Sequence, residues 1–311
     1  MLLNNRAKIR LFWLNKIFLI HLRYKRNDIM KIKNRISLLL RQLGLIKISD
    51  KVRFYLLYLK TYGKRRAFKK SNPNTCLPPS YFIYETFGLD YEQFHNDSEE
   101  TAKWLVSYFE KHKSLDNISI LDWGCGPGRI IRHMPLILGK SCRCYGTDYN
   151  ARYVTWCSEH IPEATFKPNG LEPPLPFENE MFDVIYGISI FTHLSEKMHY
   201  AWFDELFRVL KPEGILFLTL HGKAFKSKLS EEQCKIFDEG RIVVLSSTKE
   251  GHRTYGAYHP APFVKELTGD FKVIEFVEGG LINGKPQQDI WIFQKEKHQS
   301  ARTIPSRSAR R

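Results

Sequence analysis

Residues 121–129 read LDWGCGPGR, and this stretch decides the fold. It follows a short apolar run typical of a buried strand and precedes a helical pattern near residues 129–134. Glycine at positions 124, 126 and 128 lets the backbone approach a ligand, because no Cβ stands in the way. A strand, a glycine turn and a helix in this order predict a ligand site at the end of a strand in an α/β sheet.

The spacing of these glycines argues against a dinucleotide site. Dinucleotide folds use G-x-G-x-x-G and rest a pyrophosphate on the helix N-terminus, whereas this turn is G-x-G-x-G, with Arg129 where the last glycine should fall. Asp122 precedes the first glycine, and its carboxylate repels a pyrophosphate but suits a cationic ligand that carries an amino group. Asp148, at the end of the next predicted strand, can accept hydrogen bonds from both hydroxyls of a ribose.

Strands and helices alternate through the centre of the chain, which predicts a parallel sheet with helices on both faces. The expected strands are residues 118–122, 142–148, 164–166, 182–188, 215–220, 272–277 and 290–294. A capping pattern at Asp97 and Glu100 predicts where the helix before the first strand begins. The loop between the last two strands is too short for a parallel crossover. We therefore expect a Rossmann-like, doubly wound α/β sheet of seven strands with an antiparallel last strand.

Composition and charge limit the class of protein. Hydrophobic residues make up 43% and charged residues 26% of the 311 residues, which excludes a wholly disordered chain, a collagen-like fibre and a multi-span membrane protein. The net charge of +15 comes from the ends, since residues 1–70 carry +18 and residues 295–311 carry +5, whereas residues 71–294 carry −8. The total charge therefore does not favour nucleic acid as a partner.

The N-terminal 70 residues are predicted to form a basic, amphipathic helical extension. Its apolar positions recur at helical spacing, at Ile32, Ile36, Leu39, Leu40 and Leu43, then at Val52, Tyr55, Leu56 and Leu59. Two interpretations stay open: the extension packs on the main domain with a solvated basic face, or it attaches to an anionic membrane surface. The apolar run at residues 11–22 is shorter than a bilayer span and has no cleavage site after it, although a signal anchor stays open.

The turn-rich stretch SNPNTCLPP at residues 71–79 marks the expected boundary of a second domain, residues 71–295, and a disordered basic tail follows at residues 296–311. Six cysteines are too few for a disulfide scaffold, so we expect free thiols and a cytoplasmic protein, with membrane association as the alternative. No C-x-x-C or H-x-x-x-H pattern occurs, and no metal site is predicted.

Residues 76–294 resemble the class I S-adenosylmethionine-dependent methyltransferases. The family's pattern acid-x-Gly-x-Gly-x-Gly is matched at residues 122–128, its second-strand acid at Asp148, and its turn after the third strand at Asn169. The segments LPF, FDVIYGISIFTHL and RVLKPEGILFLTLHG, which begin at residues 175, 182 and 208, resemble the signatures around strands four and five. The final stretch is similar to bacterial methyltransferases that modify glycans or small metabolites.

This resemblance implies S-adenosylmethionine as cofactor and a role for each matching residue. Gly124, Gly126 and Gly128 would pass close to its methionine part, and Asp122 would hold its amino group. Asp148 would bind the ribose, Tyr149 would pack on the adenine, and Asn169 would read the adenine edge. The backbone at Gly187 and Ile188 would line the cofactor beneath the acceptor. From the residues alone, Asn169 as a turn former and Tyr149 as a packing residue stay open.

The acceptor should lie at the carboxyl ends of the strands, where ligands of open α/β sheets gather. His193 and His221 follow strands four and five, and Gln288 and Asp289 begin the last strand at the same edge. Residues 222–262 form a lid-like insertion that is expected to deliver Tyr258 and His259. His193 is the predicted general base, with a purely local hydrogen-bonding role as the alternative.

These features predict methyl transfer to an oxygen or nitrogen of a small molecule, sugar or glycolipid precursor by in-line displacement. Two other functions stay open. One is an NAD-dependent or nucleotide-sugar oxidoreductase on a similar sheet. The other is a non-catalytic module that docks to a membrane or a partner through its basic N-terminus. The oligomeric state does not follow from the sequence.

Overall fold

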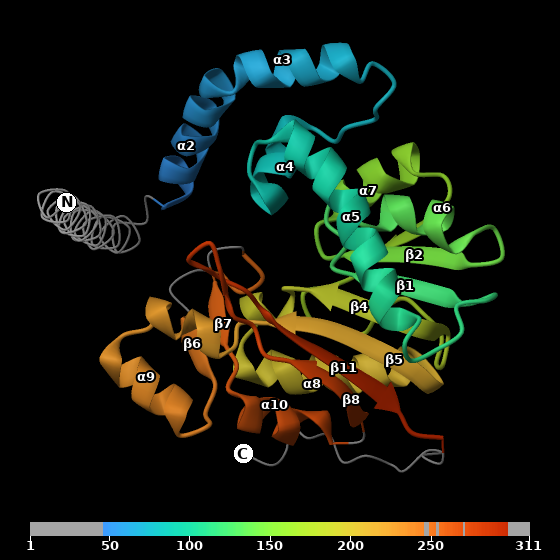
Figure 1. Ribbon diagram of the computed structural model, residues 1–311, viewed down its shortest axis with the longest axis vertical. Coiled ribbons are helices and arrows are strands. Elements are labelled where there is room, and N and C mark those ends of the chain that lie inside the picture. The colour runs from blue at the N-terminus through green and yellow to red at the C-terminus, as the bar shows by residue number, and fades with distance from the viewer. Residues whose placement is uncertain (1–45, 246–248, 253–254, 270, 298–311) are drawn as a thin grey trace, which may run out of the picture. The chain divides into compact units, whose positions relative to one another are not determined.

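The computed structural model describes residues 46–245, 249–252, 255–269 and 271–297 (Figure 1). The chain divides into two compact units, residues 1–59 and residues 60–311. The predicted features at residues 1–45 and the tail from residue 298 onward lie outside the described residues. Of the first unit, the structure describes residues 46–59, which belong to helix α2 (Ile46–Lys60). No helix of the described ranges is long and apolar enough to cross a membrane.

A seven-stranded sheet forms the centre of the second unit, in the order β3-β2-β1-β4-β5-β11-β8. Its strands are β1 (Ser119–Trp123), β2 (Arg143–Asp148), β3 (Thr165–Pro168), β4 (Phe182–Ile188), β5 (Leu210–Leu220), β8 (Phe271–Val277) and β11 (Asp289–Lys295). The first five strands in this order are parallel, and β11 runs antiparallel to both β5 and β8. The predicted Rossmann-like sheet with an antiparallel last strand is confirmed.

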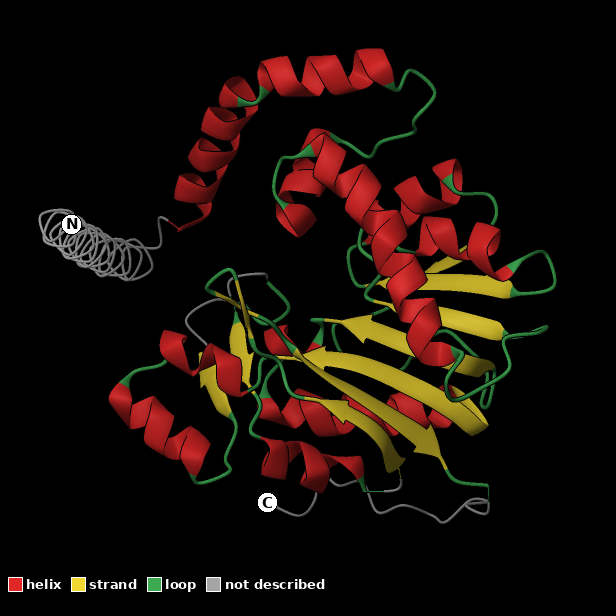
Figure 2. Ribbon diagram, in the orientation of Figure 1, coloured by secondary structure: helices red, strands yellow, loops and turns green. Residues whose placement is uncertain are grey.

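Helices cover both faces of this sheet (Figure 2). The helices described in this unit are α3 (Tyr62–Ser71), α4 (Ser80–Phe87), α5 (Tyr91–Phe109), α6 (Met134–Leu138), α7 (Ala151–His160), α8 (Glu196–Val209), α9 (Glu231–Asp238) and α10 (Ala261–Thr268), with 3-10 turns η1 (Ile131–His133), η2 (Phe191–His193) and η3 (Lys223–Lys228). Residues of α5 and α6 share one buried cluster with the sheet, and residues of α8 and α10 share the cluster on the other face. This two-sided cover explains why the central strands are apolar throughout.

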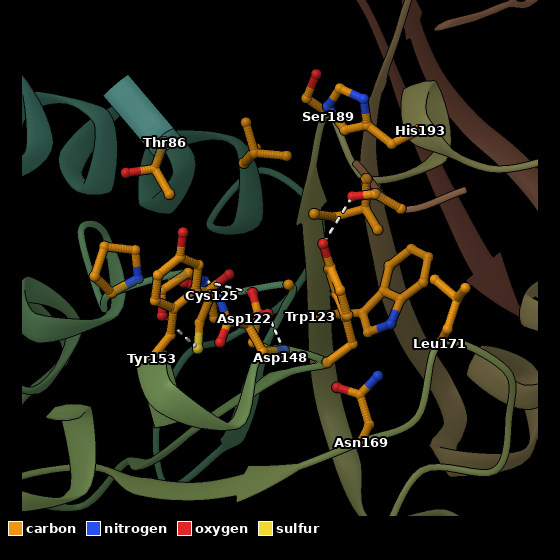
Figure 3. Close-up of a pocket in the computed structure, with 18 of the residues that line it drawn as sticks. Thr86, Asp122, Trp123, Cys125, Asp148, Tyr153, Asn169, Leu171, Ser189 and His193 are labelled. Carbon is orange, nitrogen blue, oxygen red and sulfur yellow. Dashed lines mark hydrogen bonds between the residues drawn. The ribbon is translucent and has the colours of Figure 1, made fainter. Parts of the chain in front are cut away.

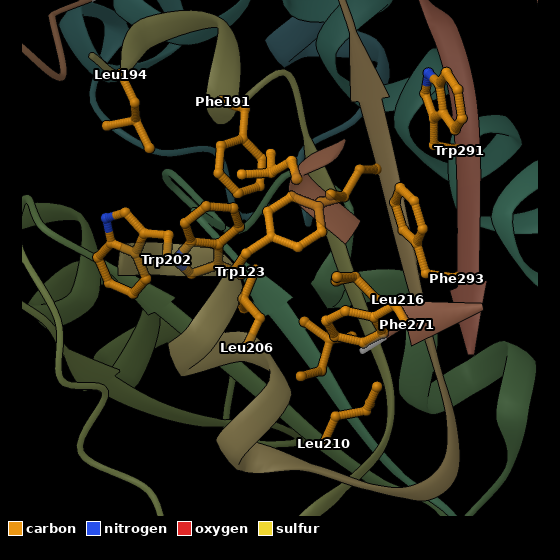
Figure 4. Close-up of a cluster of buried hydrophobic side chains, with 14 of the residues drawn as sticks. Trp123, Phe191, Leu194, Trp202, Leu206, Leu210, Leu216, Phe271, Trp291 and Phe293 are labelled. Carbon is orange, nitrogen blue, oxygen red and sulfur yellow. The ribbon is translucent and has the colours of Figure 1, made fainter. Parts of the chain in front are cut away.

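Strand β1 shows how alternation sets the two faces. Leu121 and Trp123 point into the cluster with α8, where the Trp123 ring lies 5.0 Å from those of Phe191 and Trp202 (Figure 4). Ile120 belongs to the opposite cluster, and Asp122 shares its side of the strand because side chains alternate. The motif carboxylate therefore leaves the sheet on the side that faces α5.

Helix α5 begins earlier than its capping pattern predicts. Its N-cap is Asp90, whose carboxylate accepts a hydrogen bond from the Gln93 backbone N–H at 3.0 Å. The predicted start at Asp97 is wrong, because the apolar Tyr91 and Phe94 of the first turns are buried and keep this segment helical.

The insertion at residues 222–262 has a small core of its own. Strands β6 (Val243–Leu245) and β7 (Gly256–Tyr258) pair antiparallel, and η3 and α9 pack beside them. A further hairpin, β9 (Leu281–Ile282) with β10 (Lys285–Pro286), precedes β11. The insertion lies between β5 and α10 in the chain, so it begins at the carboxyl end of β5.

Helix α3 belongs to the second compact unit, which begins at Lys60 rather than at the composition boundary near residue 71. Phe68 is buried on α5, where its ring lies 6.2 Å from that of Tyr91 and 5.8 Å from that of His95. Arg65 is buried as well. A basic composition therefore does not separate this helix from the domain.

Candidate functional site

A cavity of about 370 Å³ lies at the carboxyl ends of β1, β2 and β4 (Figure 3). Eight of the predicted site residues line it: Asp122, Gly124, Gly126, Asp148, Tyr149, Asn169, Ile188 and His193. They come from four neighbouring strands, β3, β2, β1 and β4, or from the turns that follow them. The topology of the sheet thus brings residues separated by 70 positions to one place.

The glycine turn forms one wall of this cavity. Gly124 and Gly126 have φ of 79° and 54°, in the left-handed region that favours glycine. A Cβ on Gly124 would collide with Ile190, and one on Gly126 would lie 3.3 Å from Thr86 of α4. Gly128 has a different function, because a Cβ there would lie 2.5 Å from Ile161 beside α7. Two glycines therefore open the cavity, and the third lets a helix pack closely.

Asp148 is held in place by the backbone of two turns. Its carboxylate oxygens accept hydrogen bonds from the Gly126 N–H at 2.9 Å and the Asn150 N–H at 2.8 Å. Burial raises the pKa of this carboxyl to about 6, and the two N–H groups oppose that shift. Each oxygen keeps a second lone pair, which suits the paired hydroxyls of a ribose.

Asp122 is the second buried carboxyl of the cavity. Burial raises its pKa to about 7, although the Tyr186 hydroxyl and the Arg129 guanidinium nearby lower it. Arg129 also lines the cavity. A cation that enters this space favours the ionised form of both carboxyls, because opposite charge stabilises the carboxylate. The pair therefore suits a positively charged ligand.

Tyr149 and Asn169, which follow β2 and β3, also line the cavity. The Tyr149 hydroxyl donates to the Gly251 carbonyl at 3.0 Å, and the side chain is 48% exposed, so its ring is open to a ligand. The Asn169 amide oxygen accepts from the Thr147 hydroxyl at 2.8 Å, and its amide nitrogen donates to the Gly170 carbonyl. Both polar groups of Asn169 thus have partners, one in β2 and one in the turn. Its contact with adenine stays a prediction.

His193 faces the cavity from η2, after β4. Its Nδ1 lies 3.2 Å from the Tyr255 carbonyl oxygen, and because a carbonyl only accepts, Nδ1 carries the proton. Burial lowers the pKa of the imidazole, so the ring is neutral at neutral pH. The Nε2 lone pair is then available to accept a proton from a substrate.

Ser189 lies beside His193 in an unusual conformation. Its φ is 66°, rare for a residue with a side chain, and its backbone N–H donates to the Thr219 hydroxyl at 2.9 Å. The Gln288 side-chain amide donates to the Ser189 hydroxyl at 2.6 Å. Gln288, predicted on the substrate side, therefore reaches the cavity through Ser189.

The other predicted substrate-side residues lie outside the lining of this cavity. His259 is 1% exposed, and its Nε2 is 2.8 Å from the Nε2 of His199. Tyr258 is part of the core of the insertion, and His221 stacks on Phe225 with ring centroids 4.1 Å apart. The Asp289 carboxylate accepts from the Gly279 N–H at 2.8 Å.

Gly187 also lies outside the lining, beneath the Trp123 ring: a Cβ there would come within 2.8 Å of it. Its neighbour Ile188 reaches the cavity. The absence of a side chain at Gly187 therefore leaves room for the Trp123 ring to pack in the core next to the cavity.

Several lining residues have no signal in the sequence. Glu85 and Thr86 come from α4, and the Tyr153 hydroxyl of α7 donates to the Glu85 carboxylate at 2.8 Å. Trp202 reaches the cavity from α8, and its indole N–H donates to the Leu171 carbonyl at 3.1 Å. Gly251 and His252 of the insertion complete the wall. Their positions depend on how the chain returns over the sheet, which no local pattern encodes.

Comparison with known proteins agrees with this geometry. Residues 120–214, which contain the glycine turn, both carboxylates and His193, match a family profile described as a methyltransferase domain. These residues are thus similar to a methyltransferase domain. S-adenosylmethionine is the cofactor that such a domain uses, and the residues present fit it: two buried carboxyls line the cavity, and two left-handed glycines leave room beside them.

The curated relatives match parts of the chain. Thiocyanate methyltransferase 1 of Brassica oleracea is 29% identical over 84 residues, 27% of this chain and 32% of that protein. Demethylmenaquinone methyltransferase of Lactococcus lactis is 26% identical over 141 residues, 42% and 54% of the two chains. A tRNA N(3)-methylcytidine methyltransferase of Drosophila melanogaster is 24% identical over 216 residues, 60% and 63% of the two chains. The chain thus spans less than two thirds of each relative.

Among solved structures, a SAM-dependent methyltransferase from Methanosarcina mazei is 21% identical, with a TM-score of 0.49 over 61% of this chain and 97% of that one. Magnesium protoporphyrin IX methyltransferase from Synechocystis, solved with bound SAH, is 14% identical, with a TM-score of 0.47 over 77% of this chain and 97% of that one.

Proposed function

We propose that the protein transfers a methyl group from S-adenosylmethionine to an oxygen or nitrogen of a small molecule, sugar or glycolipid precursor. The observation that carries this proposal is that Asp122, Asp148 and the neutral imidazole of His193 line the same cavity. The carboxylates select a cationic nucleoside, and the imidazole serves an acceptor whose proton must leave.

The cofactor supplies an electrophilic methyl group on a positively charged sulfur. The residues of the chain would hold and orient the cofactor: Asp122 would bind its amino group, Asp148 its ribose, and Arg129, which also lines the cavity, its carboxylate. His193 Nε2 would take the proton that the acceptor atom loses when it receives the methyl group. Ser189, held by Gln288, borders the space for the acceptor.

An oxidoreductase with a dinucleotide fits this cavity poorly. A pyrophosphate at the glycine turn would meet the Asp122 carboxylate, which is buried and adjacent to Asp148. Thermal stabilisation distinguishes the two functions: S-adenosylhomocysteine should raise the melting temperature, and NADH should leave it unchanged. Stabilisation by NADH alone would overturn the proposal.

The acceptor can be identified by mass spectrometry of its labelled product. The protein and isotopically labelled S-adenosylmethionine are incubated with a cell extract, and the labelled product is identified. The matched control is the Asp148→Asn variant, whose weakened ribose contact should abolish labelling. Labelled protein or nucleic acid, without any labelled small molecule or glycan, would contradict the proposed acceptor class.

A further inference from the structure

Helix α2 exposes a continuous apolar stripe. Ile48, Val52, Tyr55, Leu56 and Leu59 recur at i, i+4, i+7, i+8 and i+11, so they share one face of the helix. Each of these side chains is between 52% and 73% exposed. Large apolar side chains normally avoid water, and a stripe of five in one helix marks an interaction surface.

Basic residues flank this stripe on both sides. By helical spacing, Lys51 lies along one edge, and Arg53 and Lys60 lie toward the other, all three exposed. Residues 51–84 contain eight basic residues and no acidic one. The long aliphatic stems of lysine and arginine can lie along an apolar surface while their charges reach outward.

We infer that α2 lies in the interfacial plane of an anionic lipid bilayer, with the apolar stripe in the acyl boundary and the basic flanks at the headgroups. This partner satisfies both features of the helix at once, because apolar burial and attraction to anionic lipid add together. A second copy of the helix would bring like charges together, and a nucleic acid would leave the apolar stripe exposed.

The test is cosedimentation of the full chain with vesicles, which needs no cofactor and so separates this inference from the proposed activity. Vesicles of phosphatidylcholine with about 30 mol% phosphatidylserine should bind the protein, and pure phosphatidylcholine should bind it at least about tenfold more weakly. Sodium chloride at about 0.5 M should weaken binding to the anionic vesicles as well.

Two variants assign this binding to α2. Leu56→Glu with Leu59→Glu should lower vesicle affinity at least about tenfold, whereas Leu136→Glu, a matched change at an 84% exposed leucine of α6, should not. Reversing Lys51, Arg53 and Lys60 to glutamate should have a similar effect, and reversing the exposed Lys140, Lys197 and Lys265 should have a smaller one. All these positions are exposed, so the melting temperature reports whether each variant stays folded.

Three results would overturn the inference. Equal binding to neutral and anionic vesicles would remove the role of the basic flanks. Unchanged binding by the Leu56→Glu, Leu59→Glu variant would remove the role of the stripe. A wild-type dimer that this variant converts to a monomer, without vesicle binding by either, would assign the stripe to a second copy of the chain.

Discussion

Burial of the Asp122 and Asp148 carboxyls lowers the stability of the protein without ligand at neutral pH. Burial raises the pKa of the two carboxyls to about 7 and about 6. An unfolded aspartate titrates near the usual value of about 3.9. The folded state therefore binds more protons than the unfolded state between about pH 4 and 7, and stability falls as pH rises through this window. A cationic ligand reverses this cost by favouring the ionised pair.

The substitution Asp122→Asn tests this balance. Cofactor affinity should fall about 10- to 100-fold, because a charge-assisted contact is lost. The melting temperature at pH 8 should rise by about 2–4 °C, because a carboxylate no longer has to ionise in the interior. Calorimetry and thermal unfolding measure the two effects, and the exposed Asp116→Asn serves as control. A loss of affinity together with a loss of stability would point to a structural role instead.

Cofactor binding by the wild-type protein should depend on pH in the same sense. Affinity should increase from pH 5 to pH 8 and level off above the Asp122 pKa of about 7, because the ionised carboxylate binds the cation. Calorimetric titrations in buffers of different ionisation enthalpy measure the proton released on binding. Affinity that is flat over this range, with no proton release, would contradict the assigned role of Asp122.

His193 is predicted to act on the acceptor and not on the cofactor. His193→Gln should lower kcat about 10²- to 10⁴-fold and leave cofactor affinity unchanged. In the wild type, the acid limb of the rate profile should lie below the ordinary histidine pKa, because burial lowers the pKa of this imidazole. His221→Gln, outside the cavity lining, is the control and should reduce turnover much less. Equal losses in the two variants would end the assignment.

At the level of elements, local patterns predicted the sheet and the glycine turn because their signals lie within a few residues. Apolar runs predicted the strands, and the glycine spacing with Asp122 predicted a site for a cationic ligand. The start of α5 was predicted at Asp97 from a local capping pattern, and it was wrong because burial of Tyr91 and Phe94 extends the helix back to Asp90. His259 was expected at the acceptor because the insertion at residues 222–262 was interpreted as a lid, yet its side chain is buried against His199.

A buried lysine of β11 caps the C-terminus of helix α8. Lys295 is 3% exposed, and its Nζ donates to the Leu210 and Phe207 carbonyls at 2.8 and 3.0 Å and lies 3.2 Å from the Glu180 carboxylate. A charged donor thus satisfies the carbonyls at the C-terminus of the helix, which have no partner within it.

Lys295→Ala should therefore lower the free energy of unfolding by about 2–3 kcal/mol, since buried acceptors lose their donor. Lys297→Ala is the matched control: Lys297 pairs with Glu213 on the surface, and its loss should change stability by less than about 0.5 kcal/mol. Denaturant unfolding measures both, and similar values for the two variants would contradict the buried-cap explanation.

At the scale of the whole molecule, charge and compactness divide the chain at different places. The basic character extends to Lys70, whereas the compact unit that contains the cavity begins at Lys60. A basic composition predicts that a helix has a charged, solvent-exposed face. It does not predict whether the opposite face of that helix packs on the domain. Helix α3 shows the difference, since it is strongly basic and yet buries Phe68 and Arg65.

Two truncations follow from this division. A chain that begins at Lys60 should bind S-adenosylhomocysteine within about twofold of the full chain, because the unit with the cavity is complete. A chain that begins at Asn72 also loses α3 and the burial of Phe68 against Tyr91 and His95, which should cost about 1.5–3 kcal/mol of stability. Calorimetry and denaturant unfolding measure the two effects. Equal stability of the two truncated chains would place α3 outside the folded domain, and loss of cofactor binding in the longer one would extend the cofactor domain into the first 59 residues.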